Sequence, residues 1–184
     1  MKNRVLPALA WGLVLLCMAL IFFFSSQNSD ESSQTSSHAL EIVVKICAPV
    51  LKKLSAAEQF SYTETLHMVI RKIAHATIYL ILAVLTSNAL YLTDLCAAKK
   101  TLPSFVKSAC GFAIAVLYAI SDELHQYFVP GRSCELRDVL IDSAGALTGT
   151  LLYVLIFSIL WKWIQKKRAA VPPPPAAPVQ TQKK

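Results

Sequence analysis

Three clusters of ionisable side chains adjoin long apolar stretches of this sequence, and their residue types could bind or transform a charged group. Acids, histidines and basic residues all occur among them. Ionisable groups at membrane depth are costly, and they usually face a bundle interior or a water-filled cavity. We therefore take as candidate functional residues Arg71, Lys72 and His75 in the first cluster, Asp122, Glu123, His125 and Arg132 in the second, and Asp138 and Asp142 in the third.

Helical spacing places several of these side chains on shared faces, because residues three or four apart are neighbours on a helix. The aligned sets are Arg71, His75 and Tyr79; Asp122, His125 and Gln126; and Asp138, Asp142, Gly145 and Gly149. Gly145 and Gly149 also form a small-xxx-small pair, which lets a second helix approach closely. Removing one partner of a buried ion pair costs about 3–5 kcal/mol. We therefore expect pairing among Arg71, Asp122, Arg132, Asp138 and Asp142.

These residues allow several kinds of chemistry. Arg71, Lys72 and Arg132 suit a binding pocket for the phosphate or carboxylate of a lipid head group. In a catalytic site, His75 or His125 would act as acid or base, with Asp122 or Glu123 as partner. A metal site would draw on these same two histidines and two acids. The remaining interpretation is an ion-pair network that only holds the helices together, and the residues alone leave all four open.

The elements that carry the clusters are long apolar segments. The chain has 184 residues, of which 55% are hydrophobic and 16% charged, against about 25% charged in soluble domains. Four runs, at about 5–24, 74–92, 105–127 and 139–161, approach the roughly 20 residues that a helix needs to cross a bilayer. The sequence predicts an all-α integral membrane protein with four transmembrane helices in one domain, residues 1–168. A Pro-rich disordered tail is expected at 169–184.

Amphipathic helices are expected at 38–70, in the loop between the first two spans. Apolar residues recur there at helical spacing, with an interruption near Pro49. This segment would lie on the lipid surface or pack on the bundle. Ser55 and Glu58, and again Ser61 and Glu64, fit a capping box, so a helix should begin at one of them.

The basic residues predict the orientation. Four spans place both termini on one side, together with eleven of the eighteen basic residues: Lys2, Arg4, Lys99, Lys100, Lys107, Lys162, Lys166, Lys167, Arg168, Lys183 and Lys184. By the positive-inside rule this side is the cytoplasm. The net charge of +7 thus reflects orientation in the plasma membrane, and we expect no nucleic-acid partner. Cys47 and Cys134 would share the outer side, where they could form a disulfide.

The combined motifs resemble the VanZ-like family of bacterial membrane proteins. They are Arg71-Lys72-x-Ala74-His75-x-x-x-Tyr79, Ser121-Asp122-Glu123-x-His125-Gln126-x-x-x-Pro130-Gly131-Arg132, Asp138-x-x-x-Asp142-x-x-Gly145-x-x-x-Gly149 and Phe24-Ser25-Ser26-Gln27. The resemblance extends from about Trp11 to Trp161. The family's namesake is associated with low-level teicoplanin resistance, which implies a role in susceptibility to glycopeptides.

From the residues and the resemblance together, we expect a protein that binds a membrane lipid or a lipidated small molecule in a polar, outward-facing pocket. The expected ligand-binding residues are Arg71, Lys72, His75, Tyr79, Ser121, Asp122, Glu123, His125, Gln126, Arg132, Asp138 and Asp142. We expect no metal and no cofactor, and a homo-oligomer remains open. The alternatives are a membrane-embedded enzyme acting on a lipid or envelope-precursor head group, and a scaffold with a purely structural ion-pair network.

Overall fold

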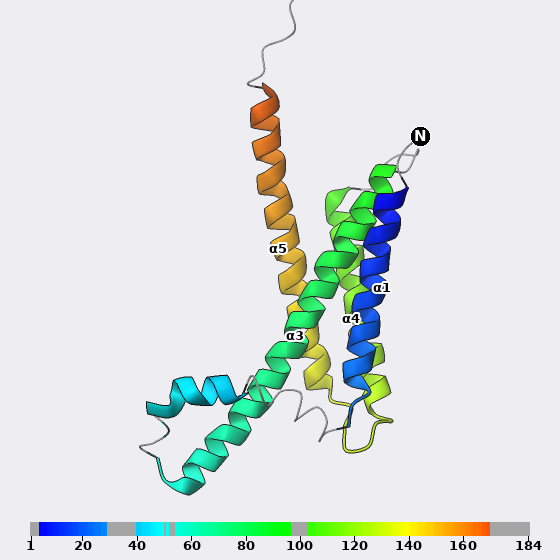
Figure 1. Cartoon of the computed structure of the whole chain (residues 1–184). Helices are drawn as coiled ribbons and strands as arrows, with labels where there is room; N and C mark the ends of the chain where they lie inside the picture. The colour runs from blue at the N-terminus through cyan, green and yellow to red at the C-terminus, as the bar shows by residue number, and fades with distance from the viewer. Residues whose placement is uncertain (1–3, 29–39, 50, 52–53, 97–102, 170–184) are drawn as a thin grey trace, which may run out of the picture.

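The computed structural model describes residues 4–28, 40–49, 51, 54–96 and 103–169. Its long helices are α1 (Val5–Ser25), α3 (Ala56–Cys96), α4 (Ser104–Gln126) and α5 (Leu136–Ala169), and residues 40–49 form a short helix (Figure 1). The described residues contain no strand. Within these residues, four segments are long and apolar enough to cross a membrane: Val5–Ser25, Ala56–Thr93, Ser104–Gln126 and Leu136–Phe157. The predicted all-helical class with four spans is confirmed.

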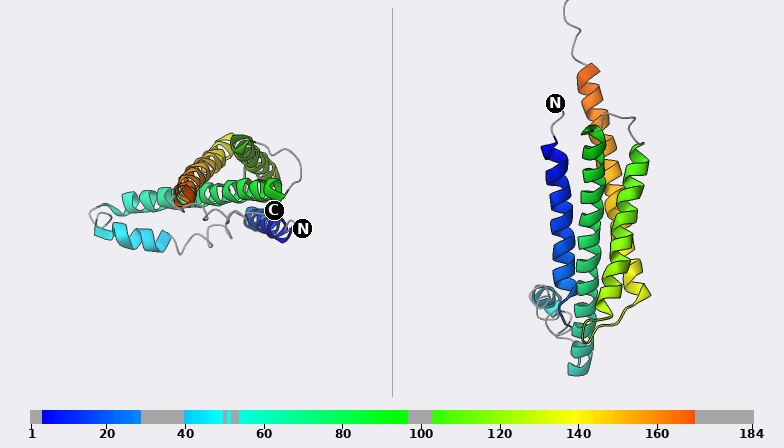
Figure 2. Two further views of the ribbon diagram at one scale, coloured as in Figure 1. Left: turned by 90° about the horizontal axis from the view of Figure 1, so that it is seen from above. Right: turned by 90° about the vertical axis from the view of Figure 1, so that its right-hand side faces the viewer.

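Helix α3 is the central element of the bundle. It packs against α1, α4 and α5, and α4 packs in turn against α5, whereas α1 has few contacts with α4. Successive spans run in opposite directions, so the N-terminal end of α1 and the C-terminal end of α5 lie at the same end of the bundle (Figure 2). This end is opposite to the connection between α4 and α5.

The core consists mainly of small side chains. Ala83, Ala115, Ala119 and Ala146 are fully buried, and they lie beside the buried Tyr79. Many large apolar side chains instead face outward, for example Leu13, Leu16 and Phe23 on α1. Small residues between helices and large apolar ones outside are the pattern of a bundle whose surroundings are lipid.

Helices α5 and α3 approach each other closely at two glycines. A Cβ atom added to Gly145 would lie 2.1 Å from the carbonyl oxygen of Ala76, and one added to Gly149 would lie 2.3 Å from that of Leu80. Any larger residue would therefore force the two backbones apart. The small-xxx-small pair thus lets a second helix approach closely, as the sequence predicts.

The second span differs most from the prediction. Its helix begins at Ala56 and has 41 residues, so residues 56–70 continue into the span instead of forming a separate segment. The start is a capping box: the Ser55 backbone N–H donates to Glu58 Oε2 at 2.8 Å, and the Glu58 N–H donates to Ser55 Oγ at 3.4 Å. Ser61, the other candidate start, lies inside the helix. This first part of α3 projects from the bundle, near the helix of residues 40–49 (Figure 1).

The remaining expectations concern a disulfide and three polar segments of the chain. Cys47 and Cys134 are both free thiols, so the disulfide considered for them is absent. Apart from Ala169, the predicted tail at 169–184 lies outside the described residues, as do residues 29–37 of the polar segment after the first span and residues 97–102 of the loop before α4.

Candidate functional site

A polar cavity lies where α3, the end of α4, the 127–135 connection and the start of α5 meet. Its volume is about 90 Å³, which is room for several waters or a phosphate-sized group, since one water needs roughly 10–15 Å³ of free volume. The lining residues are Arg71, Lys72, His75, Glu123, Gln126, Gly131, Arg132, Ser133, Glu135, Asp138, Ile141 and Asp142. The three clusters that are distant in the sequence therefore meet at one site.

The connection between α4 and α5 turns sharply so that Arg132 faces the cavity. Gly131 has a φ of 77°, a left-handed conformation that glycine adopts without steric cost. The Arg132 N–H donates to the Val129 carbonyl at 3.2 Å. Glu123 Oε2 accepts the backbone N–H of Glu135 at 3.1 Å and so ties the connection back to α4.

Lys72 and Asp138 form an ion pair between α3 and α5, and both side chains are partly buried. One of the three basic residues of the lining is therefore paired with one of its four acids. The pair lies on the lining and joins α3 to α5.

Arg132 is the basic residue whose own hydrogen bonds are incomplete. Its Nε and Nη2 atoms are buried, and no hydrogen-bond acceptor for them exists among the described residues. Burial lowers the pKa of Arg132, and the nearby Arg71 lowers it further, whereas Asp122, Glu123 and Asp138 act in the opposite direction. A guanidinium nonetheless stays protonated at physiological pH. The lining therefore includes a charged group, two of whose buried nitrogens have no acceptor among the described residues.

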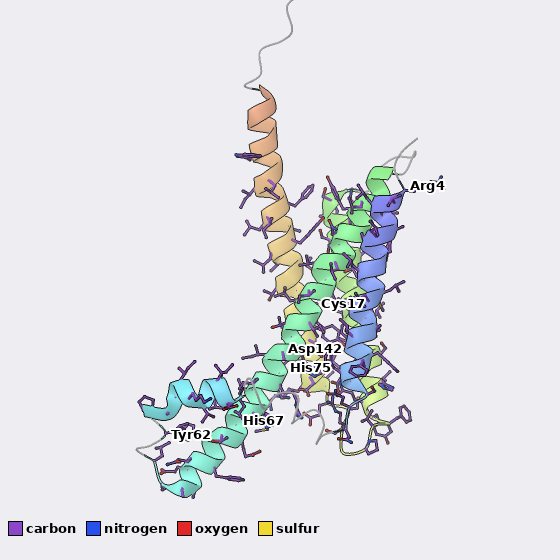
Figure 3. The ribbon with its side chains drawn as sticks, in the orientation of Figure 1. Arg4, Cys17, Tyr62, His67, His75 and Asp142 are labelled. Atoms are coloured by element: carbon purple, nitrogen blue, oxygen red, sulfur yellow. The ribbon has the colours of Figure 1, made fainter. Side chains whose placement is uncertain are left out.

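A second layer of polar groups lies behind the lining. Asp122 is buried and accepts a hydrogen bond from Gln126 Nε2 at 3.2 Å. Tyr79 is fully buried and interacts electrostatically with Asp122 and Asp142. Figure 3 shows His75 and Asp142 close together, at the end of the bundle opposite to Arg4. Asp122 and Tyr79 therefore lie behind the lining residues Gln126 and Asp142.

Two predicted site residues lie elsewhere. The ring of His125 stacks on that of Phe22 in α1, with centroids 4.6 Å apart, and Ser121 is exposed and donates to the Tyr118 carbonyl at 2.8 Å. Neither side chain lines the cavity. His75 and Glu123 are thus the two catalytic candidates that do line it, with Asp122 directly behind. Within the described part of the chain, no three His, Cys, Asp or Glu side chains are grouped as metal ligands.

The sequence reasoning missed four lining residues: Gly131, Ser133, Glu135 and Ile141. Glu135 had a usable signal, because it is an acid that immediately precedes α5 and lies between the Pro-Gly-Arg turn and Asp138. Its carbonyl accepts the N–H of Asp138 at 2.9 Å, so it also begins the helix.

The arrangement defines a class: a helical membrane protein with four candidate spans and a mixed-charge cavity at one end of its bundle. The VanZ/LLP1 family model matches residues 10–158, most of the chain, and the protein therefore belongs to the VanZ/LLP1 family. The predicted resemblance is confirmed. No curated protein and no solved structure matches this chain.

Proposed function

We propose that the cavity binds the phosphate or carboxylate head group of a membrane lipid or of a lipidated small molecule. The observation that carries this proposal is the buried Arg132 guanidinium, with Nε and Nη2 free for an acceptor. Two parallel N–H donors match the paired oxygens of a phosphate or carboxylate. Arg71, which lines the same cavity, adds a second positive charge.

Two features favour binding over a purely structural network. A network that only holds helices should pair its buried charges and leave no space between them. Here Lys72 is paired with Asp138, but Arg132 has free donors beside a cavity of about 90 Å³. The acids Glu123 and Asp142 on the same lining would accept hydrogen bonds from hydroxyl or amino groups of the same head group.

The proposed location of the cavity is the outer side of the plasma membrane, with both termini in the cytoplasm. The distribution of basic residues supports this orientation through the positive-inside rule. A head-group site there would change how the envelope responds to a lipid-anchored glycopeptide, so we further propose an effect on teicoplanin susceptibility.

The test compares Arg132→Gln with Arg137→Gln at equal expression. Arg137 is also basic and close in sequence, but it is exposed and does not line the cavity. We expect the lipid retained by the purified protein and the teicoplanin tolerance of the cells to fall in the first variant and to remain unchanged in the second. Equal retention and equal tolerance in both variants would refute the proposal.

A second candidate function is catalysis on a lipid or envelope-precursor head group. It is favoured by the presence of His75 and Glu123 on one lining, where they could act as acid and base on a bound group. Lipids extracted from deletion and overexpression strains distinguish the two functions: catalysis requires a chemical change that disappears with His75→Gln, and binding alone requires none.

A further inference from the structure

The polar cavity has more acids than bases on its lining, which is unexpected for a site that binds an anion alone. The charged lining residues are Glu123, Glu135, Asp138 and Asp142 against Arg71, Lys72 and Arg132. The ion pair of Lys72 with Asp138 removes one charge of each sign, and within the described part of the chain the cavity contains no other ion pair. A ligand with only negative charge would leave the remaining acids without a counter-charge, which is costly for buried groups.

The negative end of the cavity is at Asp142. Its side chain is only 2% exposed, and the charges that act on it most strongly are those of Asp122, Glu123, Asp138 and Lys72. Lys72 is the one cation in this set, and it already forms an ion pair with Asp138. A further group that carries positive charge and N–H donors would therefore be stabilised beside Asp142.

The positive end of the cavity is formed by Arg132 and Arg71. The charge of Arg71 helps to lower the pKa of Arg132, so the two guanidinium groups lie near each other. Nε and Nη2 of Arg132 are buried and have no acceptor among the described residues. Neither arginine is among the charges that act most strongly on Asp142. The two signs of charge are therefore separated within the cavity.

The two ends lie at different depths in the bundle. Arg132 belongs to the connection between α4 and α5, whereas Asp142 lies in the second turn of α5, farther into the bundle than this connection (Figure 3). A ligand that enters from the end of the bundle would therefore reach Arg132 first and Asp142 last.

Arg132 also lines a groove outside the polar cavity, beside the end of α4. The other residues of this groove are Leu124, Tyr127, Ser133 and Cys134, and its surface is mostly apolar. The side chains of Leu124 and Tyr127 are both exposed. Because Arg132 and Ser133 belong to both linings, the apolar groove is continuous with the positive end of the cavity.

We propose that the ligand is a phospholipid with a primary amine in its head group, such as phosphatidylethanolamine; this inference rests on the head-group binding proposed above. The phosphate binds Arg132 and Arg71, the ammonium group binds Asp142, and an acyl chain leaves the cavity along the groove at Leu124 and Tyr127. Chain, phosphate and amine follow one another in such a lipid in the same order as groove, Arg132 and Asp142 in the protein. Phosphatidylglycerol, whose head group ends in hydroxyl groups, would satisfy Arg132 but bring no positive charge to Asp142.

Native mass spectrometry of the full-length protein in a non-ionic detergent tests the class of ligand, with phosphatidylethanolamine or phosphatidylglycerol of identical acyl chains added. We expect the wild type to retain phosphatidylethanolamine about tenfold more than phosphatidylglycerol. Asp142→Asn removes the charge at nearly constant size, so it should lower the retention of phosphatidylethanolamine and abolish the preference. The matched control Glu64→Gln removes an exposed acid of α3 that does not line the cavity, and it should keep the preference. A preference that persists in Asp142→Asn would overturn the placement of the amine.

The wild-type comparison remains decisive if Asp142→Asn does not fold, and Arg132→Gln separates failure of this inference from failure of the proposed function. Both lipids contain the phosphate, so Arg132→Gln should lower the retention of both. Equal retention of the two lipids by the wild type, with loss of both in Arg132→Gln, would overturn the amine-bearing ligand and leave head-group binding intact. Retention of neither lipid by the wild type would refute head-group binding and this inference with it.

Soluble phosphoethanolamine distinguishes a lipid from a free molecule with the same two charges. It lacks the acyl chain that contacts the groove, so an equal concentration should not displace phosphatidylethanolamine from the wild type. Displacement at equal concentration would overturn the proposal, because the chain would then contribute nothing and the occupant would be a soluble molecule.

Discussion

At the scale of single residues, the neighbours of Arg132 position its side chain more than its own hydrogen bonds do. Gly131 turns the backbone toward the cavity, and the acids Asp122, Glu123 and Asp138 oppose the effect of burial, which lowers the pKa of the guanidinium. A buried charged donor without an acceptor costs several times more than a satisfied one gains. The cavity should therefore always contain an acceptor, either water or the head group of a ligand.

The substitution Glu123→Gln separates binding from catalysis. The amide oxygen of glutamine can still accept the Glu135 N–H, so the connection should stay in place. Removal of a negative charge beside Arg132 should strengthen binding of a phosphate-headed lipid by about three- to tenfold. The dissociation constant is to be measured for the purified wild-type and Glu123→Gln proteins.

Catalysis predicts a different result for the same variant. If Glu123 served as a general base, Glu123→Gln would reduce turnover of the lipid by roughly 10²- to 10⁴-fold. Unchanged affinity together with unchanged lipid chemistry would contradict both roles and would leave Glu123 only with holding the connection.

At the scale of elements, the contact between α3 and α5 controls the shape of the cavity. Gly145 lies one turn beyond Ile141 and Asp142, which line the cavity, and its missing side chain allows α5 to contact the backbone at Ala76. The backbone oxygen cannot move aside as a flexible side chain would. The two helices must therefore separate if any atom is added there.

We predict that Gly145→Ala lowers the thermal unfolding temperature of the protein in detergent, whereas Gly12→Ala does not. The first substitution places a Cβ 2.1 Å from the Ala76 oxygen, and such overpacking costs about 1–3 kcal/mol, which is several degrees. Gly12 has nothing within 4 Å, and alanine favours a helix. Equal unfolding temperatures for the two variants would show that the backbones are not in close contact at Gly145.

The sequence predicted elements well where an apolar run determined them, and less well where a polar segment continued a helix. The runs at 5–24, 105–127 and 139–161 correspond to α1, α4 and α5. The start of α3 was placed too late because residues 56–70 are too polar for a span, although they contain no glycine or proline to end a helix. The Ser55 capping box was the better guide to its start.

Within the site, helical spacing predicted correctly which helices carry the site residues. It did not predict for every residue whether the side chain faces the cavity. Asp122 and His125 share a helical face by spacing, yet the proximity of Phe22 in α1 draws the His125 ring away from the cavity. Only the packing of α1 determines this, and no pattern within α4 encodes it. Arg71, Glu123 and Asp142, which come from three different helices, do meet as expected.

At the scale of the whole molecule, the polar cavity and a second cavity have opposite character. The first is small, with mixed charge and both acids and bases on its lining, whereas the second is larger, at about 520 Å³, and its lining, which includes Tyr91, Tyr153 and Phe157, is mostly apolar. The first lies at the end of α4 and the second at its beginning, so the length of one span separates them.

The orientation of this arrangement can be tested with a native cysteine. Cys134 is an exposed, free thiol in the connection that contributes Arg132 and Ser133 to the first cavity. A variant in which Cys134 is the sole cysteine should react with a membrane-impermeant maleimide in intact cells, because this connection lies outside in the orientation that we propose from the positive-inside rule. A variant with Cys110 alone should not react: Cys110 is exposed on α4, within a span, where its surroundings would be lipid. Labelling of Cys134 only after permeabilisation would place the first cavity in the cytoplasm, and an effect on teicoplanin at the outer surface would then lose its physical basis.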